Sequence, residues 1–89
     1  MEIIVFTAEW CGPCKKLKPI LDNLENKMNL KVTRLDVEKE DEAVENYTIR
    51  SIPTIVILKD GKEVDRISGL VPSEVLEAKF KLHNKKANE

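Results

Sequence analysis

The sequence predicts an α/β domain with a four-stranded mixed sheet and helices on both faces of the sheet. Residues 3–6 and 55–58 are apolar at every position, which is typical of short strands buried on both sides. A helix-length stretch separates the first run from residues 30–37, so the strands at its two ends should be parallel. Asp60 and Gly61 are a two-residue hairpin signal and add an antiparallel pair. The predicted element order is therefore β-α-β-α-β-β-α.

The first helix is predicted from Cys11 to about Met28, because its apolar residues recur every three or four positions. These residues are Leu17, Ile20, Leu21, Leu24 and Met28. Pro19 falls inside the helix and is expected to kink it. Residues 30–37 then predict the second strand.

The second helix is predicted in a mostly acidic segment. Residues 38–45 carry five acidic side chains against Lys39, which favours an exposed loop and a solvated helix face over an interaction patch. Ala43, Val44 and Tyr47 give this helix a narrow apolar stripe.

The last part of the chain is predicted to return along the sheet and end in a helix. Residues 64–68 form the return strand of the hairpin, and Gly69 and Pro72 end it. Ser73 is expected to cap the final helix. The inward-facing residues of this helix are predicted to be Val75, Leu76 and Phe80.

Composition and charge narrow the class of protein. The 89 residues fit one domain spanning residues 1–89, with residues 84–89 as a loose polar tail. Fifteen basic residues against sixteen acidic ones leave no field to attract nucleic acid or anionic lipid. No apolar run approaches the ~20 residues of a membrane span, and the N-terminus lacks the pattern of a signal peptide. We therefore expect a cytoplasmic protein.

Both cysteines of the chain, Cys11 and Cys14, stand at the predicted start of the first helix. Unpaired N–H groups and the positive end of the helix dipole favour a thiolate there, and the thiolate is the nucleophile of thiol–disulfide exchange. A partner three positions on lies one helical turn away, within reach of a disulfide. In a reducing compartment such a pair is more typical of catalysis than of a structural crosslink. The pair therefore predicts a reversible dithiol switch.

Two other interpretations of the cysteine pair stay open. It would serve as half of a zinc or iron–sulfur site if a second chain completed the ligands, because this chain adds only His83. It would also serve as a structural disulfide, although so small a ring removes little chain entropy, about 2 kcal/mol. We expect no metal.

The chain resembles the thioredoxin family over residues 3–83, which implies a thioredoxin-like fold. The resemblance is carried by residues 8–15, AEWCGPCK, which match the family's active-site segment, and by residues 49–54, IRSIPT, which match the segment with its cis-proline. Further matches stand at Pro19, Asp60, Gly61 and Gly69. This combination of motifs is highly specific for the family, whereas a lone CxxC motif would be weak evidence for it.

The resemblance implies a role for each matched site residue. Cys11 would be the exposed nucleophile, and Cys14, more buried, would resolve the mixed disulfide. Pro53 would be cis and lie against the cysteine pair, and the backbone of Ile52 would pair with substrate in an extended, strand-like way. The flat apolar rim would consist of Trp10, Gly12, Pro13 and Gly69.

The chain departs from the family pattern at three places. It begins almost directly at the first strand, so we expect the usual opening strand and helix to be missing and residues 30–37 to form a sheet edge. Lys31 and Arg34 would guard that edge. Val5 stands where the family usually has a buried aspartate, which leaves open what handles the proton of Cys14. Thr7 stands where a tryptophan is common.

The implied activity is that of a small disulfide reductase. It would act on disulfide-bearing client proteins and be recycled by a thioredoxin reductase or an equivalent enzyme. We expect a monomer without a bound cofactor, because the two sulfurs carry both electrons. Gly12 and Pro13 between the cysteines resemble the reducing members of the family. The alternatives are a glutaredoxin-like enzyme served by glutathione and a binding module that uses the fold without its thiols.

Overall fold

The elements of the chain follow the predicted order. The computed structural model describes residues 1–84, so residues 85–89 of the predicted tail lie outside the described residues. The elements are β1 (Glu2–Thr7), α1 (Gly12–Met28), β2 (Lys31–Asp36), α2 (Asp41–Asn46), β3 (Thr54–Lys59), β4 (Lys62–Ser68) and α3 (Ser73–His83). Helix α1 continues through Pro19.

The four strands form one mixed sheet in the order β2-β1-β3-β4. Strand β1 runs parallel to β2 and antiparallel to β3, and β3 pairs with β4 across the hairpin. The two inner strands, β1 and β3, are buried at every position of residues 3–6 and 55–58, as the continuous apolar runs predicted. Strand β2 lies at the sheet edge, which was also predicted.

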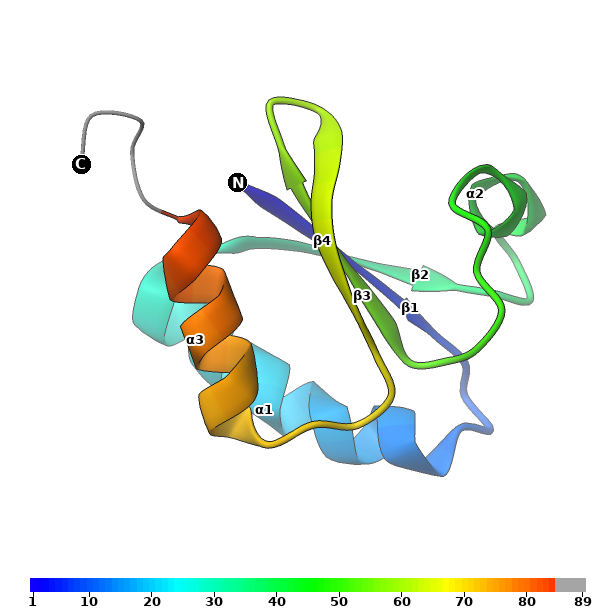
Figure 1. The fold of residues 1–89 in the computed structure, drawn as a ribbon. Coiled ribbons are helices and arrows are strands. Elements are labelled where there is room, and N and C mark those ends of the chain that lie inside the picture. The colour runs from blue at the N-terminus through cyan, green and yellow to red at the C-terminus, as the bar shows by residue number, and fades with distance from the viewer. Residues whose placement is uncertain (85–89) are drawn as a thin grey trace.

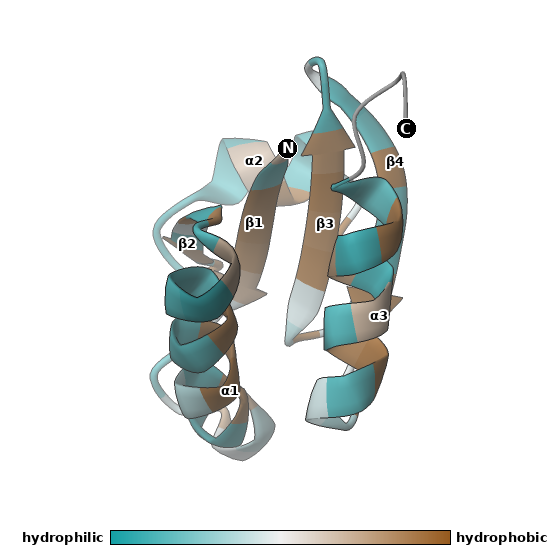
Figure 2. Cartoon of the chain, turned by 90° about the vertical axis from the view of Figure 1, so that its left-hand side faces the viewer, coloured by the Kyte–Doolittle hydropathy of each residue, from teal (hydrophilic) through white to brown (hydrophobic). Residues whose placement is uncertain are grey.

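The helices cover both faces of the sheet (Figure 1). Helices α1 and α3 lie on one face and α2 on the other. Figure 2 shows hydrophobic and hydrophilic segments alternating along α1 and α3, whereas β1 and β3 are hydrophobic over most of their length. This striping is the pattern of helices that bury one side against a sheet.

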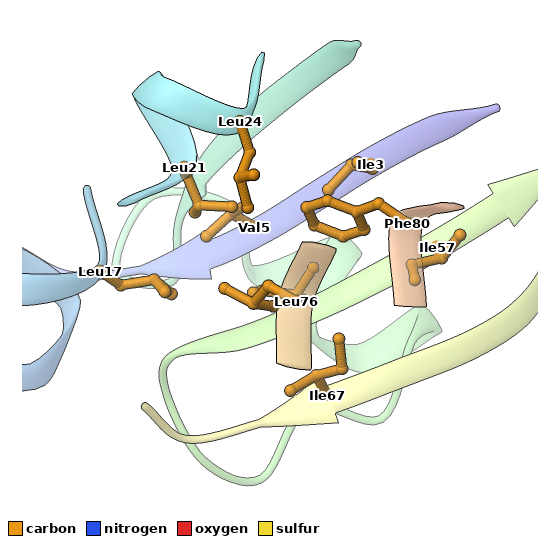
Figure 3. Packing of buried hydrophobic residues seen from close by; sticks show 10 residues of the cluster. Ile3, Val5, Leu17, Leu21, Leu24, Ile57, Ile67, Leu76 and Phe80 are labelled. Carbon is orange, nitrogen blue, oxygen red and sulfur yellow. The ribbon is translucent and has the colours of Figure 1, made fainter. Parts of the chain in front are cut away.

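The larger core lies between the sheet and the pair of helices α1 and α3. Figure 3 shows side chains from both helices converging on the inner strands. The residues that it labels are Ile3, Val5, Leu17, Leu21, Leu24, Ile57, Ile67, Leu76 and Phe80, all of them buried. On the other face Ile4, Phe6, Val56 and Leu58 pack against α2, including its predicted stripe of Ala43, Val44 and Tyr47.

Two expectations for α3 are wrong. Ser73 is the first helical residue and Pro72 takes the N-cap position without a side-chain capping bond, so Ser73 does not cap the helix. A serine caps only from a non-helical backbone just before the first turn. Val75 is 42% exposed, whereas Leu76 and Phe80 are fully buried. Successive helical residues are turned by about 100°, so α3 buries Leu76 and turns Val75 toward solvent.

The β3–β4 hairpin turns at the predicted dipeptide. Asp60 and Gly61 have φ values of 55° and 79°, the left-handed pair that a two-residue hairpin turn with right-handed strand twist requires. The return strand starts at Lys62, earlier than predicted. The register shifts between Ile57 and Leu58, which leaves Val64 without a partner in the ladder.

A carboxylate fastens α3 to β4. Asp65 Oδ2 on β4 accepts a hydrogen bond from Lys79 Nζ and pairs with His83 Nε2, each at 2.9 Å. The hydrogen bond from Lys79, then that from His83, lowers the pKa of Asp65 to about 2. His83, the ligand on which a zinc site depended, is therefore engaged on β4.

Substitution of Asp65 should destabilise the fold in a pH-dependent way. The pKa of Asp65 is lowered by folding from 3.8 to about 2, so its contribution is present above pH 4 and lost as the pH falls through about 2. We expect Asp65→Asn to lower the free energy of unfolding by roughly 1–2 kcal/mol at neutral pH. Denaturant unfolding of the parent and of Asp65→Asn measures the loss. Asp60→Asn, which removes a carboxylate from the exposed turn, is the control. A difference that persists near pH 2 would contradict this account.

Candidate active site

The cysteine pair lies where β1 leaves the sheet and α1 begins. Cys11 and Cys14 form a disulfide with their Cα atoms 5.2 Å apart. A turn closed by the Cys11 N–H on the Ala8 carbonyl, at 3.2 Å, carries the chain from the strand to the helix. Cys11 is the N-cap residue of α1, and its Sγ accepts a hydrogen bond from the backbone N–H of Cys14 at 3.2 Å. The first sulfur therefore takes the place of an ordinary capping oxygen.

The expected difference in exposure between the two cysteines is wrong for this disulfide-bonded form. Cys11 is 5% exposed and Cys14 is 6% exposed. Both belong to a small cluster with Ala8, against which Val37 and Ile52 pack. What separates the two sulfurs is their position on α1: one residue caps the helix and the other lies in its first turn.

The segment around Pro53 meets the disulfide from the neighbouring strand. The Ile52–Pro53 peptide bond is cis, as the resemblance implied. The N–H of Gly69 donates to the Pro53 carbonyl at 2.8 Å, and the Thr54 hydroxyl donates to the Ser51 carbonyl at 2.7 Å. The structure thus packs Ile52 against the cysteines, places Pro53 and Cys14 on one cavity, and joins Gly69 to the Pro53 carbonyl.

The remaining rim residues, Trp10, Gly12 and Pro13, are exposed to solvent. Trp10 is 66% exposed, and its Nε1 donates a hydrogen bond of 2.6 Å to Glu38 Oε1. Gly12 and Pro13 are exposed at the start of α1. Trp10 and Ile52 share a shallow groove of about 300 Å³, whose other lining residues are Val37, Val44, Ile49, Arg50 and Ser51.

A larger cavity lies on the other side of Cys14. It measures about 550 Å³, and Cys14 and Pro53 line it together with Val5, Thr7 and Asp36. Val5 and Thr7 are two of the three places at which the chain departs from the family pattern. The small side chain of Thr7 and the apolar one of Val5 leave Asp36 as the carboxylate on the strands that border this cavity.

Two polar residues of the site escaped the sequence prediction. Asp36 ends β2, and Glu38 was assigned to a solvated acidic run. Thr7 pairs with Asp36 in the parallel register, and the Val37 N–H donates to the Thr7 carbonyl at 2.9 Å. The carboxyl ends of neighbouring parallel strands meet at one edge of a sheet, where α/β proteins commonly bind ligands. This rule would have drawn attention to both residues.

No group of three or more His, Cys, Asp or Glu side chains within residues 1–84 is arranged to hold a metal ion. In the same part of the chain, no helix combines the length and the apolar character needed to cross a bilayer.

Comparisons with known proteins agree on one family. The family model described as Thioredoxin matches residues 1–82. A thioredoxin of Chlamydia caviae is 42% identical over 77 residues, which cover 85% of this chain and 76% of that protein. A thioredoxin of Bacillus subtilis is 40% identical over 80 residues, which cover 88% of this chain and 77% of the relative.

Solved structures show the same likeness. A mutant thioredoxin from Halobacterium salinarum NRC-1 superposes with a TM-score of 0.90 at 28% identity, over 96% of this chain and 75% of the other. The thioredoxin of Fasciola hepatica superposes with a TM-score of 0.86 at 35% identity, over 92% of this chain and 79% of the other.

A carboxylate placed at position 5 should report on the burial of this site. Val5 is buried in the core and borders the cavity at Cys14. Burial raises the pKa of an acid, so the folded state of Val5→Asp would hold a proton that the unfolded state releases. We expect this variant to lose roughly 2–3 kcal/mol of unfolding free energy, with a larger loss at neutral than at acid pH.

Denaturant melts across pH measure this effect, with Val5→Asn as the uncharged control. A loss that is equal for both variants at every pH would mean that position 5 does not lie in a desolvated environment.

Proposed function

Because this chain belongs to the thioredoxin family and is a thiol–disulfide oxidoreductase, we propose that it reduces the disulfides of client proteins through Cys11 and Cys14. The observation that carries the proposal is the disulfide at the start of α1, which lies beside a cis-proline segment. Only a pair that closes and reopens serves as a two-electron carrier, and the small ring keeps the second sulfur within reach of the first.

In the first step Cys11 acts as the nucleophile. Its position at the N-cap of α1 supports this role, because backbone N–H groups and the helix dipole favour a thiolate there. The thiolate attacks one sulfur of the client disulfide. A bond forms between Cys11 and that sulfur, and the second client sulfur leaves as a thiolate.

In the second step Cys14 acts as the resolving thiol. Its Sγ attacks Cys11 Sγ, the bond from Cys11 to the client breaks, and the Cys11–Cys14 disulfide forms. The two cysteines together give up two electrons, and both client sulfurs end reduced. No bound cofactor takes part in this cycle.

We assign client binding to the rim around the pair, in which the Pro53 side chain is itself buried. Its residues are Trp10, Gly12, Pro13, Ile52, Pro53 and Gly69. Within residues 1–84 the backbone of Ile52 makes no hydrogen bond to the rest of the chain, so its groups are available to an extended client segment. Pro53 has no N–H that would compete beside the sulfurs. The shallow groove between Trp10 and Ile52 would take an apolar client side chain.

The family supports a proposal for the cellular setting. We propose that a thioredoxin reductase, or an equivalent enzyme, returns the disulfide to the dithiol. We further propose that the chain works in the cytoplasm as a monomer, with residues 1–89 as a single domain. The bacterial relatives and the near balance of acidic and basic residues support this setting.

Alkylation of the reduced protein should distinguish the two thiols. We expect brief treatment with iodoacetamide near neutral pH to modify Cys11 well before Cys14, because only Cys11 occupies the N-cap. Mass mapping of the labelled peptides measures the ratio. The Cys14→Ser variant should keep the fast reaction and Cys11→Ser should lose it. Faster labelling of Cys14 would reverse the assigned roles.

Client trapping should separate attack from resolution. In Cys14→Ser the mixed disulfide with a client has no resolving thiol, so covalent complexes should accumulate. Cys11→Ser and the double variant should form few. Purified variants are mixed with a disulfide-bearing protein such as insulin. Non-reducing gels then measure the amount of covalent complex. Equal trapping by the two single variants would refute the order of attack.

A further inference from the structure

Asp36 lies on the wall of the cavity that Cys14 also lines. Side chains alternate between the faces of a strand, so Val32, Arg34 and Asp36 share the face of β2 that α1 covers. Arg34 confirms this orientation, because its guanidinium contacts Asp22 at 2.6 Å and Glu25 at 3.2 Å, both on α1. Asp36 is the next residue on that face, toward the end where Cys14 lies.

The Asp36 carboxylate is held in place by a hydrogen bond but is not paired with a cation among residues 1–84. Its Oδ1 accepts a hydrogen bond of 2.9 Å from the Glu38 N–H. Within residues 1–84 it makes no ion pair. The side chain is half-buried at the end of a strand, so its position is set by the sheet. One carboxylate oxygen therefore stays available to the cavity.

The other charged groups that line the cavity are less suited to accept a proton. Lys15, Lys18 and Arg34 are cations, and Lys18 and Arg34 also pair with Asp22. Glu9 is a second carboxylate, but it is exposed in the turn before the cysteines. Strand β1 contributes only Val5 and Thr7, and the Pro53 segment contributes no titratable group.

The resolving step needs a proton acceptor, because Cys14 must become a thiolate before it attacks Cys11. The cavity is roomy and partly polar, which is what a bridging water requires. We propose that Asp36 accepts, through water in this cavity, the proton that Cys14 loses in the resolving step. This inference rests on the role proposed above for Cys14.

The proton of Cys14 Sγ passes through water to the Asp36 carboxylate, and Cys14 Sγ bonds to Cys11 Sγ. The bond from Cys11 to the client breaks, and the client sulfur leaves with the electron pair as a thiolate. The Cys11–Cys14 pair is oxidised and the client reduced. Asp36 then returns its proton to water.

A two-phase stopped-flow assay tests the proposal. Reduced protein is mixed with an aryl disulfide that releases one coloured thiolate on attack by Cys11 and a second when Cys14 resolves the adduct. The second phase is intramolecular and therefore independent of reagent concentration. Asp36→Asn keeps the Oδ1 acceptor for Glu38 but removes the base. We expect it to slow the second phase about tenfold or more near neutral pH and to leave the first unchanged.

The pH profile separates proton transfer from a structural effect. Without Asp36, hydroxide must remove the proton, so the second-phase rate should rise about tenfold per pH unit, more steeply than in the parent. Asp36→Glu keeps a carboxylate on the same wall and should retain the shallower profile. Glu9→Gln removes the same charge from the same cavity and should leave the second phase unchanged.

An unchanged second phase in Asp36→Asn would overturn the proposal, and so would equal slowing in Asp36→Asn and Glu9→Gln. The Cys14→Ser variant isolates the underlying assumption. If its second phase survives at full rate, the assigned role of Cys14 fails, whatever the behaviour of the Asp36 variants.

Discussion

Burial of β1 on both faces is the constraint on which the rest of the structure depends. Ile3 and Val5 enter the core under α1 and α3, while Ile4 and Phe6 enter the core under α2. A strand with no polar face requires helices on both sides of the sheet. It also requires a neighbour on each edge, which β2 and β3 supply. The chain leaves this confinement only after Thr7, and the redox pair follows at once. The cysteine pair thus follows directly on an inner strand that is held on both faces and both edges.

The end of β2 supplies polar groups to both sides of the disulfide. Asp36 lies on the α1 side, at the cavity lined by Cys14. Two residues later Glu38 holds the indole of Trp10 at the shallow groove, and Val37 between them packs against the cysteines. The proposed proton transfer and the proposed client binding therefore draw on separate residues of one short run at a strand end. Charge changes in the cavity and shape changes in the groove need not interfere with each other.

The parts of this structure that the sequence predicted are those with local causes. The apolar runs of β1 and β3 and the hairpin at Asp60 and Gly61 depend on a few adjacent residues. The edge position of β2 and the cis-proline came from the resemblance. Val75 was misjudged because its exposure depends on how α3 is rotated against the sheet. The pairing of Trp10 with Glu38 joins residues 28 positions apart, and no periodicity announces such a contact. The predicted difference in exposure between the cysteines was wrong because their burial depends on Val37 and Ile52, which come from two other segments.

The sulfur that we propose attacks the client disulfide is also the sulfur that caps α1. Cys11 Sγ accepts the N–H of Cys14, so each chemical change at this sulfur alters the partner of that one amide. A thiolate is a stronger acceptor than a disulfide sulfur, and a client adduct presents a third environment. The Cys14 amide is therefore an intrinsic spectroscopic reporter. Its resonance in a nitrogen–proton correlation spectrum would distinguish the dithiol, the adduct and the disulfide without any attached label.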